Sequence, residues 1–371
     1  MISPLLYGVV YLYLIIFLTF GEALKVREYS FTRIQNSHNK LLYPILICSI
    51  LAIWLGNRPS EFYHVFGDSY TYAHNFHLYE LDMFDSTEKK GEVIWNYAMM
   101  YSAQRISVEL FFTIVSCVYF GLTLWASIKF TRNNPLATFL FFLGSLSFYS
   151  YATNGLRNGV ACSLVLVGLA FLTNRNIKRV IAIIFFITAF FIHRSTILPI
   201  GMAFVAILFR QQFKLSLIFW ILSIVISITI GNTISNFLAG LGFDDRVESY
   251  LITNAVGDKN AGGFRWDFLV YSAMPILLGY YIVIKRQITD NKYLFLLNTY
   301  TLTNAFWVMI IRASFSNRIA YLSWFMLPIV LAYPLLKLNI WDDQQGKRLA
   351  QIMLAQVGFT WFMDTFVWTT A

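Results

Sequence analysis

Charged residues are scarce in this chain. Only 13% of its 371 residues are Asp, Glu, Lys or Arg, and 58% are hydrophobic, whereas an average soluble domain has roughly 25% charged residues. Windows of about 15 to 20 residues between the polar loops are apolar on every side, and a helix needs about 20 such residues to cross the hydrocarbon core. The alternating pattern of a membrane β-barrel is absent. The sequence therefore predicts an all-α, polytopic integral membrane bundle.

Cysteine and the common catalytic motifs are also nearly missing. The three cysteines, Cys48, Cys117 and Cys162, lie inside apolar runs and have no metal-binding spacing. The chain contains no HExxH, CxxC, GxSxG, Walker lysine loop or GxGxxG, which argues against ATP and NAD chemistry. His74 and His77 are three residues apart, but two histidines without further ligands are weak grounds for a metal site. We therefore predict no cofactor and no metal.

Eleven apolar runs predict membrane spans, and the tail at 349–371 is a candidate for a twelfth. Several runs are shorter than the usual minimum, so we expect one or two helices to tilt or re-enter. The first run lacks a basic n-region and a cleavage site, which indicates a retained helix. No repeat or appended soluble domain is recognisable, so residues 1–371 are predicted to form one membrane domain. The runs are 4–20, 41–57, 108–128, 135–150, 159–173, 180–192, 196–209, 215–231, 268–284, 293–311 and 319–336.

Basic residues set the orientation. A net charge of +9 suggests a nucleic-acid partner in a soluble protein, but basic cytoplasmic loops in a membrane protein. With the N-terminus outside, six short inner loops hold seventeen of the 28 Lys and Arg residues, at least two in each. These loops are 21–40, 129–134, 174–179, 210–214, 285–292 and 337–348. The long loops at 58–107 and 232–267 are then outside, where we expect the functional site.

Five arginines lie near span ends at this outer face. Charges near a span tend to face a bundle interior or a watery cavity. Guanidinium groups from separate loops favour an anionic ligand such as phosphate, and a helix beginning after "GLRN" adds amide donors. The alternative for each arginine is a snorkelling anchor at the end of a span. The five are Arg157, Arg194, Arg265, Arg312 and Arg318.

Two residues are candidate general bases. His193 follows an apolar run, and imidazole titrates near neutral pH, but a backbone carbonyl at a helix end is an equally simple partner for it. Asp68 follows Gly67, where it forms an Asx turn, binds sugar hydroxyls or accepts a proton from the acceptor alcohol. The nearby Tyr70 and Tyr72 either stack on sugars or belong to the interfacial aromatic belt.

Five short motifs, in this order, resemble the EpsG-like branch of Wzy-type polysaccharide polymerases over about residues 60–335. They are "GDSYTY", "NGLRNGVACSLVLVGLAFL", "FFIHRSTILPI", "FRWDFLVYSAMPILLGYY" and "SNRIAYLSWFMLPIVL". Asn158 stands where these proteins usually have glutamine. The resemblance implies a membrane glycosyltransferase related to the GT-C class that uses no nucleotide sugar. It also implies transfer of the growing glycan from undecaprenyl diphosphate to the sugar of another lipid-linked repeat unit, at the periplasmic side of the inner membrane.

From the reaction that the resemblance implies, we infer roles for the outer residues. Arg157, Arg265 and Arg318 would stabilise the departing diphosphate, and Arg194 and Arg312 are weaker candidates for the same role. Asp68 or His193 would activate the acceptor hydroxyl. Its partners would be the lipid-linked donor and acceptor, the bilayer, and a flippase and chain-length regulator of the same pathway, with no nucleic acid. The residues expected at the sugar are Tyr70, Tyr72, Asn158, Ser195, Asp267, Asn317 and Tyr321.

Three other functions stay open at this point. An O-antigen ligase uses the same lipid donor but delivers the glycan to lipid A core. A sugar acyltransferase would use His193 as its base, although acyl-CoA usually approaches from the cytoplasm. A transporter of lipid-linked oligosaccharide is disfavoured, because transporters tend to carry midplane charges and repeated halves, whereas the charges here lie at span ends.

Overall fold

The computed structural model describes residues 3–37, 41–59, 63–83, 92–172, 177–209, 212–239, 263–312 and 316–368. All regular structure within these ranges is helical. The chain forms two compact units, Met1–Arg194 with Leu335–Ala371, and Ser195–Pro334. Both units contain helices long and apolar enough to cross a membrane, so the division runs inside the predicted membrane domain. The prediction of a polytopic helical membrane protein is confirmed.

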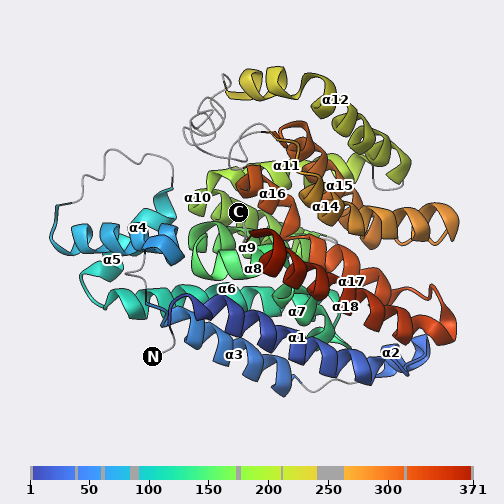
Figure 1. Cartoon of the computed structure of the whole chain (residues 1–371), viewed down its shortest axis with the longest axis horizontal. Coiled ribbons are helices and arrows are strands. Elements are labelled where there is room, and N and C mark those ends of the chain that lie inside the picture. Colours follow the sequence, from blue (N-terminus) through green and yellow to red (C-terminus); the bar gives the residue numbers. More distant parts are fainter. Residues whose placement is uncertain are drawn as a thin grey trace. The chain divides into compact units, whose positions relative to one another are not determined.

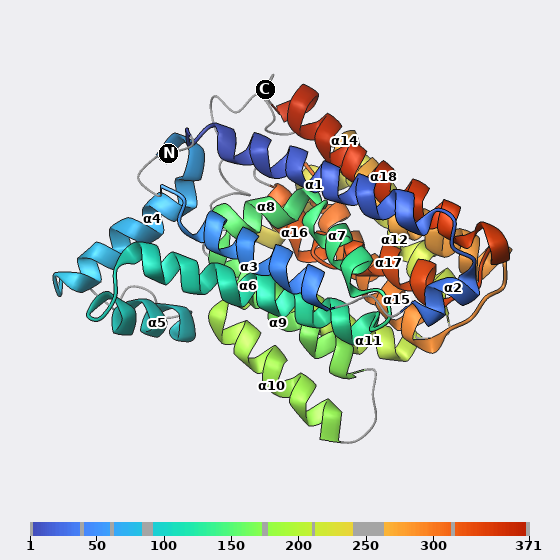
Figure 2. The same cartoon turned by 90° about the horizontal axis from the view of Figure 1, so that it is seen from below.

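The first unit joins the two ends of the chain. The N-terminal helix α1 packs against α18, and α6 packs against both α3 and α9, as Figures 1 and 2 show. Helix α9 in turn packs along α10, and the shorter α5 contacts α4, α6 and α10. The helices of this unit are α1 (Leu6–Val26), α2 (Phe31–Asn36), α3 (Leu42–Gly56), α4 (Tyr63–Glu80), α5 (Val93–Ala103), α6 (Val108–Phe130), α7 (Pro135–Leu143), α8 (Leu146–Thr153), α9 (Leu156–Leu172), α10 (Ile177–Ile192), η4 (Asp342–Gln344), α18 (Gln345–Phe362) and η5 (Met363–Trp368).

The second unit is built around α15, which packs against α11, α12, α14 and α16. Several buried polar side chains on α15 have neutral hydrogen-bond partners, which low-polarity surroundings favour. Asn304 accepts a hydrogen bond from the indole of Trp220 at 2.8 Å and donates one to Ser323 at 2.9 Å. The helices are η2 (Arg194–Thr196), α11 (Ile197–Phe209), α12 (Phe213–Ala239), α14 (Trp266–Gly279), η3 (Tyr280–Lys285), α15 (Asn291–Met309), α16 (Ser316–Trp324) and α17 (Leu327–Lys337), which ends in the first unit.

The predicted spans fall on helices, but α15, at the predicted span 293–311, is not among the described helices with the composition to cross a membrane. Within the described residues, five helices have the length and composition to cross a membrane, or six if one bent pair is a single span, and four apolar helices are shorter. The run at 135–150 is not one straight helix, because α7 and α8 meet at 74°. The break falls at Gly144 and Ser145, where the Ser145 hydroxyl donates to the Phe142 carbonyl at 2.8 Å and local hydrogen bonding replaces the helical ladder.

The two long stretches predicted to be outer loops differ in structure. The stretch 58–107, expected as a loop, contains α4 and α5. In the stretch 232–267, α12 continues to residue 239 and α14 begins at Trp266, and residues 240–262 lie outside the described ranges. The tail at 349–371 is helical through α18 and η5 up to residue 368. The described part of 58–107, which the charge bias predicts to lie outside, therefore contains helices that can carry functional side chains.

Candidate functional site

Three helix ends meet in the first unit: the start of α5, the start of α9 and the end of α10. Helix α9 begins shortly after the end of α8, and Gly159 lies in the first turn of α9. A Cβ at this position would lie 2.9 Å from the Cβ of Tyr151 and 3.3 Å from Cε2 of Tyr119. Glycine therefore allows α9 to begin close against α8 and α6, and this close start carries Arg157 into the interior.

Arg157 forms a buried ion pair. Its Nη1 bonds to a carboxylate oxygen of Glu92, and the two side chains are only 5% and 16% exposed. Glu92 immediately precedes α5, so the pair joins positions 65 residues apart. Because little solvent reaches either group, the pair is screened much less than a surface pair.

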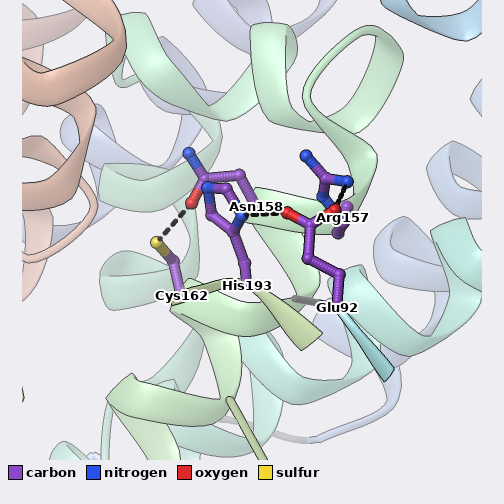
Figure 3. Close-up of polar contacts among 5 residues, drawn as sticks. All are labelled: Glu92, Arg157, Asn158, Cys162 and His193. Atoms are coloured by element: carbon purple, nitrogen blue, oxygen red, sulfur yellow. Dashed lines mark hydrogen bonds and ion pairs between the residues drawn. The ribbon is translucent and has the colours of Figure 1, made fainter. Parts of the chain in front are cut away.

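His193 completes this cluster. The peptide N–H of His193 donates to the Ala189 carbonyl at 2.9 Å, which closes the last turn of α10. Its Nδ1 lies 3.1 Å from Oε1 of Glu92, and its side chain is 11% exposed. Figure 3 shows that Arg157 and His193 approach the Glu92 carboxylate from different sides. A single carboxylate therefore links α9 to α10 through both of its oxygens.

Asn158 is close to this cluster but bonds elsewhere. The thiol of Cys162 donates to its side-chain oxygen at 3.3 Å, one helical turn further along α9 (Figure 3). The residue that follows His193 in the chain, Arg194, opens the η2 turn and has an exposed side chain. The structure thus brings together Arg157, Asn158 and His193, three of the residues predicted from sequence.

The remaining candidates of the first unit lie on α4. Asp68 is half-buried, and Tyr70 is exposed. The ring of Tyr72 lies 5.3 Å from the ring of Trp95 in α5. The Tyr72 ring therefore helps to hold α5, the helix that Glu92 precedes, against α4.

In the second unit, two of the predicted arginines have partners among the described residues. Arg265 binds Asp267 through two nitrogens, at 3.0 and 2.6 Å, and its guanidinium carbon lies 3.7 Å from the centre of the Phe268 ring. Nε of Arg312 donates to the Ser227 carbonyl at 3.2 Å. Arg265 thus has a local counter-charge, and Arg312 is bound by a neighbouring helix.

The other predicted residues of this unit lie on two segments. Arg318 is exposed and Tyr321 is buried on α16, where the Tyr321 ring lies 5.5 Å from that of Trp324. Asn317 belongs to the same helix, and its side chain is outside the described part of the structure. Ser195 lies in the η2 turn and is half-buried.

Two charged residues of the site region were missed by the sequence reasoning, Glu92 and Arg58. Glu92 ends a polar stretch of acids and lysines, "DSTEKKGE", which is typical of a solvated loop. Arg58 follows α3 and looks like an ordinary span-end anchor. Only one signal was available for Glu92: it directly precedes the apolar "VIWNYAMM".

Arg58 is fully buried and links three helices. It donates to the Leu55 carbonyl at the end of α3 at 2.9 Å and to the Ser69 hydroxyl of α4 at 2.5 Å, and that hydroxyl donates to the Thr153 carbonyl that ends α8. No carboxylate among the described residues forms an ion pair with it. Its charge faces the C-terminal end of α3 and the rings of Phe66 and Phe112 instead. Burial lowers the pKa of Arg58 to about 10, so the side chain remains cationic at neutral pH.

Metal ligands do not cluster in the described residues, where no three His, Cys, Asp or Glu side chains are placed to share an ion. His77, one of the two neighbouring histidines on α4, has its Nδ1 3.1 Å from Oε2 of Glu80. The charged and hydrogen-bonding side chains of the described site are suited to binding anions and to transferring protons.

Comparison with known proteins identifies a family. A family model described as the EpsG family matches residues 40–369 of the chain. No curated protein and no solved structure matches it. The matched range contains every residue of the cluster in Figure 3.

Proposed function

Because this chain belongs to the EpsG family, whose members are Wzy-type polysaccharide polymerases, we propose that it joins lipid-linked oligosaccharide repeat units. The donor is a growing glycan on undecaprenyl diphosphate, and the acceptor is the sugar of another lipid-linked repeat. The reaction takes place at the periplasmic face of the bacterial inner membrane. The observation that carries this proposal is the buried cluster of Glu92, Arg157 and His193 within a multi-pass helical protein of this family.

The cluster suits displacement at an anomeric carbon. The departing diphosphate gains negative charge in the transition state, so cations fixed beforehand stabilise it more than the ground state. Arg157 is held by Glu92 through Nη1, and a guanidinium has five N–H donors, so an ion pair through that nitrogen is compatible with phosphate binding. Arg194 directly follows His193 and is exposed.

The distribution of basic residues supports an outer location. The cluster lies at the end of α10 opposite the basic loop 174–179, which the charge bias assigns to the cytoplasm. Single cysteines in a variant without native cysteines test this orientation, at Glu80 outside and Arg348 inside, both exposed. We expect E80C to react with an impermeant maleimide in spheroplasts and R348C to react only after lysis. The reverse pattern would contradict the periplasmic site.

Gene deletion followed by sizing of surface glycans tests the function itself. A polymerase deletion leaves single repeat units on the final acceptor, whereas loss of a ligase leaves none. Purified protein in proteoliposomes, supplied with lipid-linked repeats extracted from the deletion strain, should make longer lipid-linked chains. Movement of these lipids across the bilayer without lengthening would identify a transporter and refute the proposal.

A further inference from the structure

Glu92 contacts both basic side chains of the Figure 3 cluster, yet it has no assigned role in the chemistry. We propose that Glu92 is a positioning residue that holds His193 as the base for the acceptor hydroxyl. This inference rests on the proposed polymerase function and deepens it, because it assigns the proton transfer to one atom, Nε2 of His193.

The ion pair fixes which nitrogen of His193 carries the proton. Arg157 is always protonated in practice, and its contact with Glu92 favours the ionised carboxylate. An ionised carboxylate only accepts hydrogen bonds. The Nδ1 of His193, 3.1 Å from Oε1 of Glu92, must therefore carry its proton and donate it. A neutral imidazole in this tautomer has its lone pair on Nε2, the nitrogen on the other side of the ring.

The cluster also fixes the orientation of the ring. Glu92 stands at the start of α5, and α5 packs against α10. The main chain of His193 is anchored to the last turn of α10 by its bond to Ala189. With the main chain and Nδ1 both held, rotation of the imidazole is restricted. A base held in this way loses little orientational freedom when the acceptor binds.

The proton transfer balances as follows. Nε2 of His193 takes the proton of the acceptor hydroxyl while the hydroxyl oxygen forms a bond to the anomeric carbon of the donor. The bond from that carbon to the diphosphate oxygen breaks, and the diphosphate leaves with the electron pair. The resulting imidazolium is stabilised by the negative charge of Glu92 and then returns its proton to water. Arg157 keeps Glu92 in place throughout.

A second Glu–His pair on α4 supplies a matched control. His77 and Glu80 are also 3.1 Å apart, but their side chains are 58% and 56% exposed, and they are three residues apart on one helix. Replacing Glu80 by glutamine removes the same chemical contact outside the cluster. E80Q is therefore expected to keep the wild-type turnover.

The test measures initial rates of chain extension in proteoliposomes for the wild type and for E92Q, H193N, E92Q/H193N, E92D and E80Q. The H193N change keeps an amide N–H near the position of Nδ1 but removes Nε2. We expect E92Q and H193N each to lower kcat by roughly 10²- to 10⁴-fold with little change in KM. E92D, which keeps the charge, should recover part of the loss. The double variant should be no slower than the slower single variant, because Glu92 acts only through His193.

Other outcomes would overturn the inference. If the losses of E92Q and H193N multiply in the double variant, Glu92 does not act through His193. If E92Q keeps the wild-type kcat, Glu92 likewise does not act through His193. If E92Q fails to accumulate in the membrane, the same cycle is run with E92D, whose carboxylate is displaced by about one methylene. A wild-type protein that does not extend chains from authentic lipid-linked repeats refutes the polymerase function instead, whatever the variants do.

Discussion

Two glutamate–histidine pairs in this protein have the same length and opposite surroundings. His77 and Glu80 share one face of α4, three residues apart and more than half exposed. His193 and Glu92 come from different helix ends, 101 residues apart, and are 11% and 16% exposed. The first pair contributes little to stability, because solvent screens its charges and holding both side chains in place costs entropy. The second pair is shielded from water and shares its carboxylate with Arg157, so its loss leaves a buried charge without its partner.

The two pairs differ in what brings their charges together. A local pair needs only helical spacing, and Arg265 with Asp267 in the second unit is similarly local. The buried pair requires α5, α9 and α10 to be packed in one particular way. Four substitutions with controls test whether contacts that depend on packing matter more than local ones. They are given from the largest expected effect to the smallest.

The largest effect is expected for R157Q. This change leaves the Glu92 carboxylate buried without its cation, and breaking a buried ion pair from one side costs roughly 3–5 kcal/mol. Thermal unfolding in detergent should report the loss of stability, and polymer should be absent from the cells. The neutral double variant E92Q/R157Q should regain stability but not polymer. An R157Q protein as stable as the wild type would show that the Arg157–Glu92 ion pair does not contribute to stability.

R58M should come next. Methionine fills much of the space of the arginine stem but loses the bonds to the Leu55 carbonyl and the Ser69 hydroxyl. Hydrogen bonds to a charged group contribute about 1.5–3 kcal/mol, so we expect a loss of stability of about that size. The control is R105M, because Arg105 also donates to a carbonyl and lies over a tyrosine ring but is exposed. Equal losses in R58M and R105M would contradict the importance of burial.

G168A tests the packing that brings α9 and α10 together. A Cβ at Gly168 would lie 2.4 Å from Cε1 of Phe186 in α10. Overpacking of this kind costs roughly 1–3 kcal/mol, and a shift of α10 would move His193 away from Glu92. We expect lower stability and shorter polymer by gel sizing. Gly121, which has nothing within 4 Å of its Cβ position, is the control, and G121A should be neutral or slightly stabilising.

E80Q should have the smallest effect. An exposed pair at this spacing contributes about 0.5 kcal/mol or less, so the midpoint of thermal unfolding should hardly change and polymer length should be normal. The matched measurement on E92Q should show a clear loss in both. A similar stability loss in E80Q and E92Q would mean that burial does not distinguish the two pairs.

Much of the fold was readable from composition. The scarcity of charge and the length of the apolar runs predicted a helical membrane protein, and the ends of α9 and α10 fall next to Arg157 and His193 as expected. The bend between α7 and α8 was not predicted, because a Gly–Ser pair inside an apolar run is compatible with a continuous helix. The sequence predicts a loop where α4 and α5 lie, because their aromatic and polar residues lack a long apolar run.

The sequence by itself determined that the chain lies in a membrane and which family it belongs to, because the hydrophobic effect depends on composition and the motifs are local. It also singled out Arg157 and His193, since polar residues at span ends are conspicuous. Only the tertiary structure decided that Glu92 joins them. The apolar run after Glu92 marks the start of a helix but does not distinguish a carboxylate in solvent from one buried at the meeting of three helices, because burial is set by packing between segments far apart in the chain.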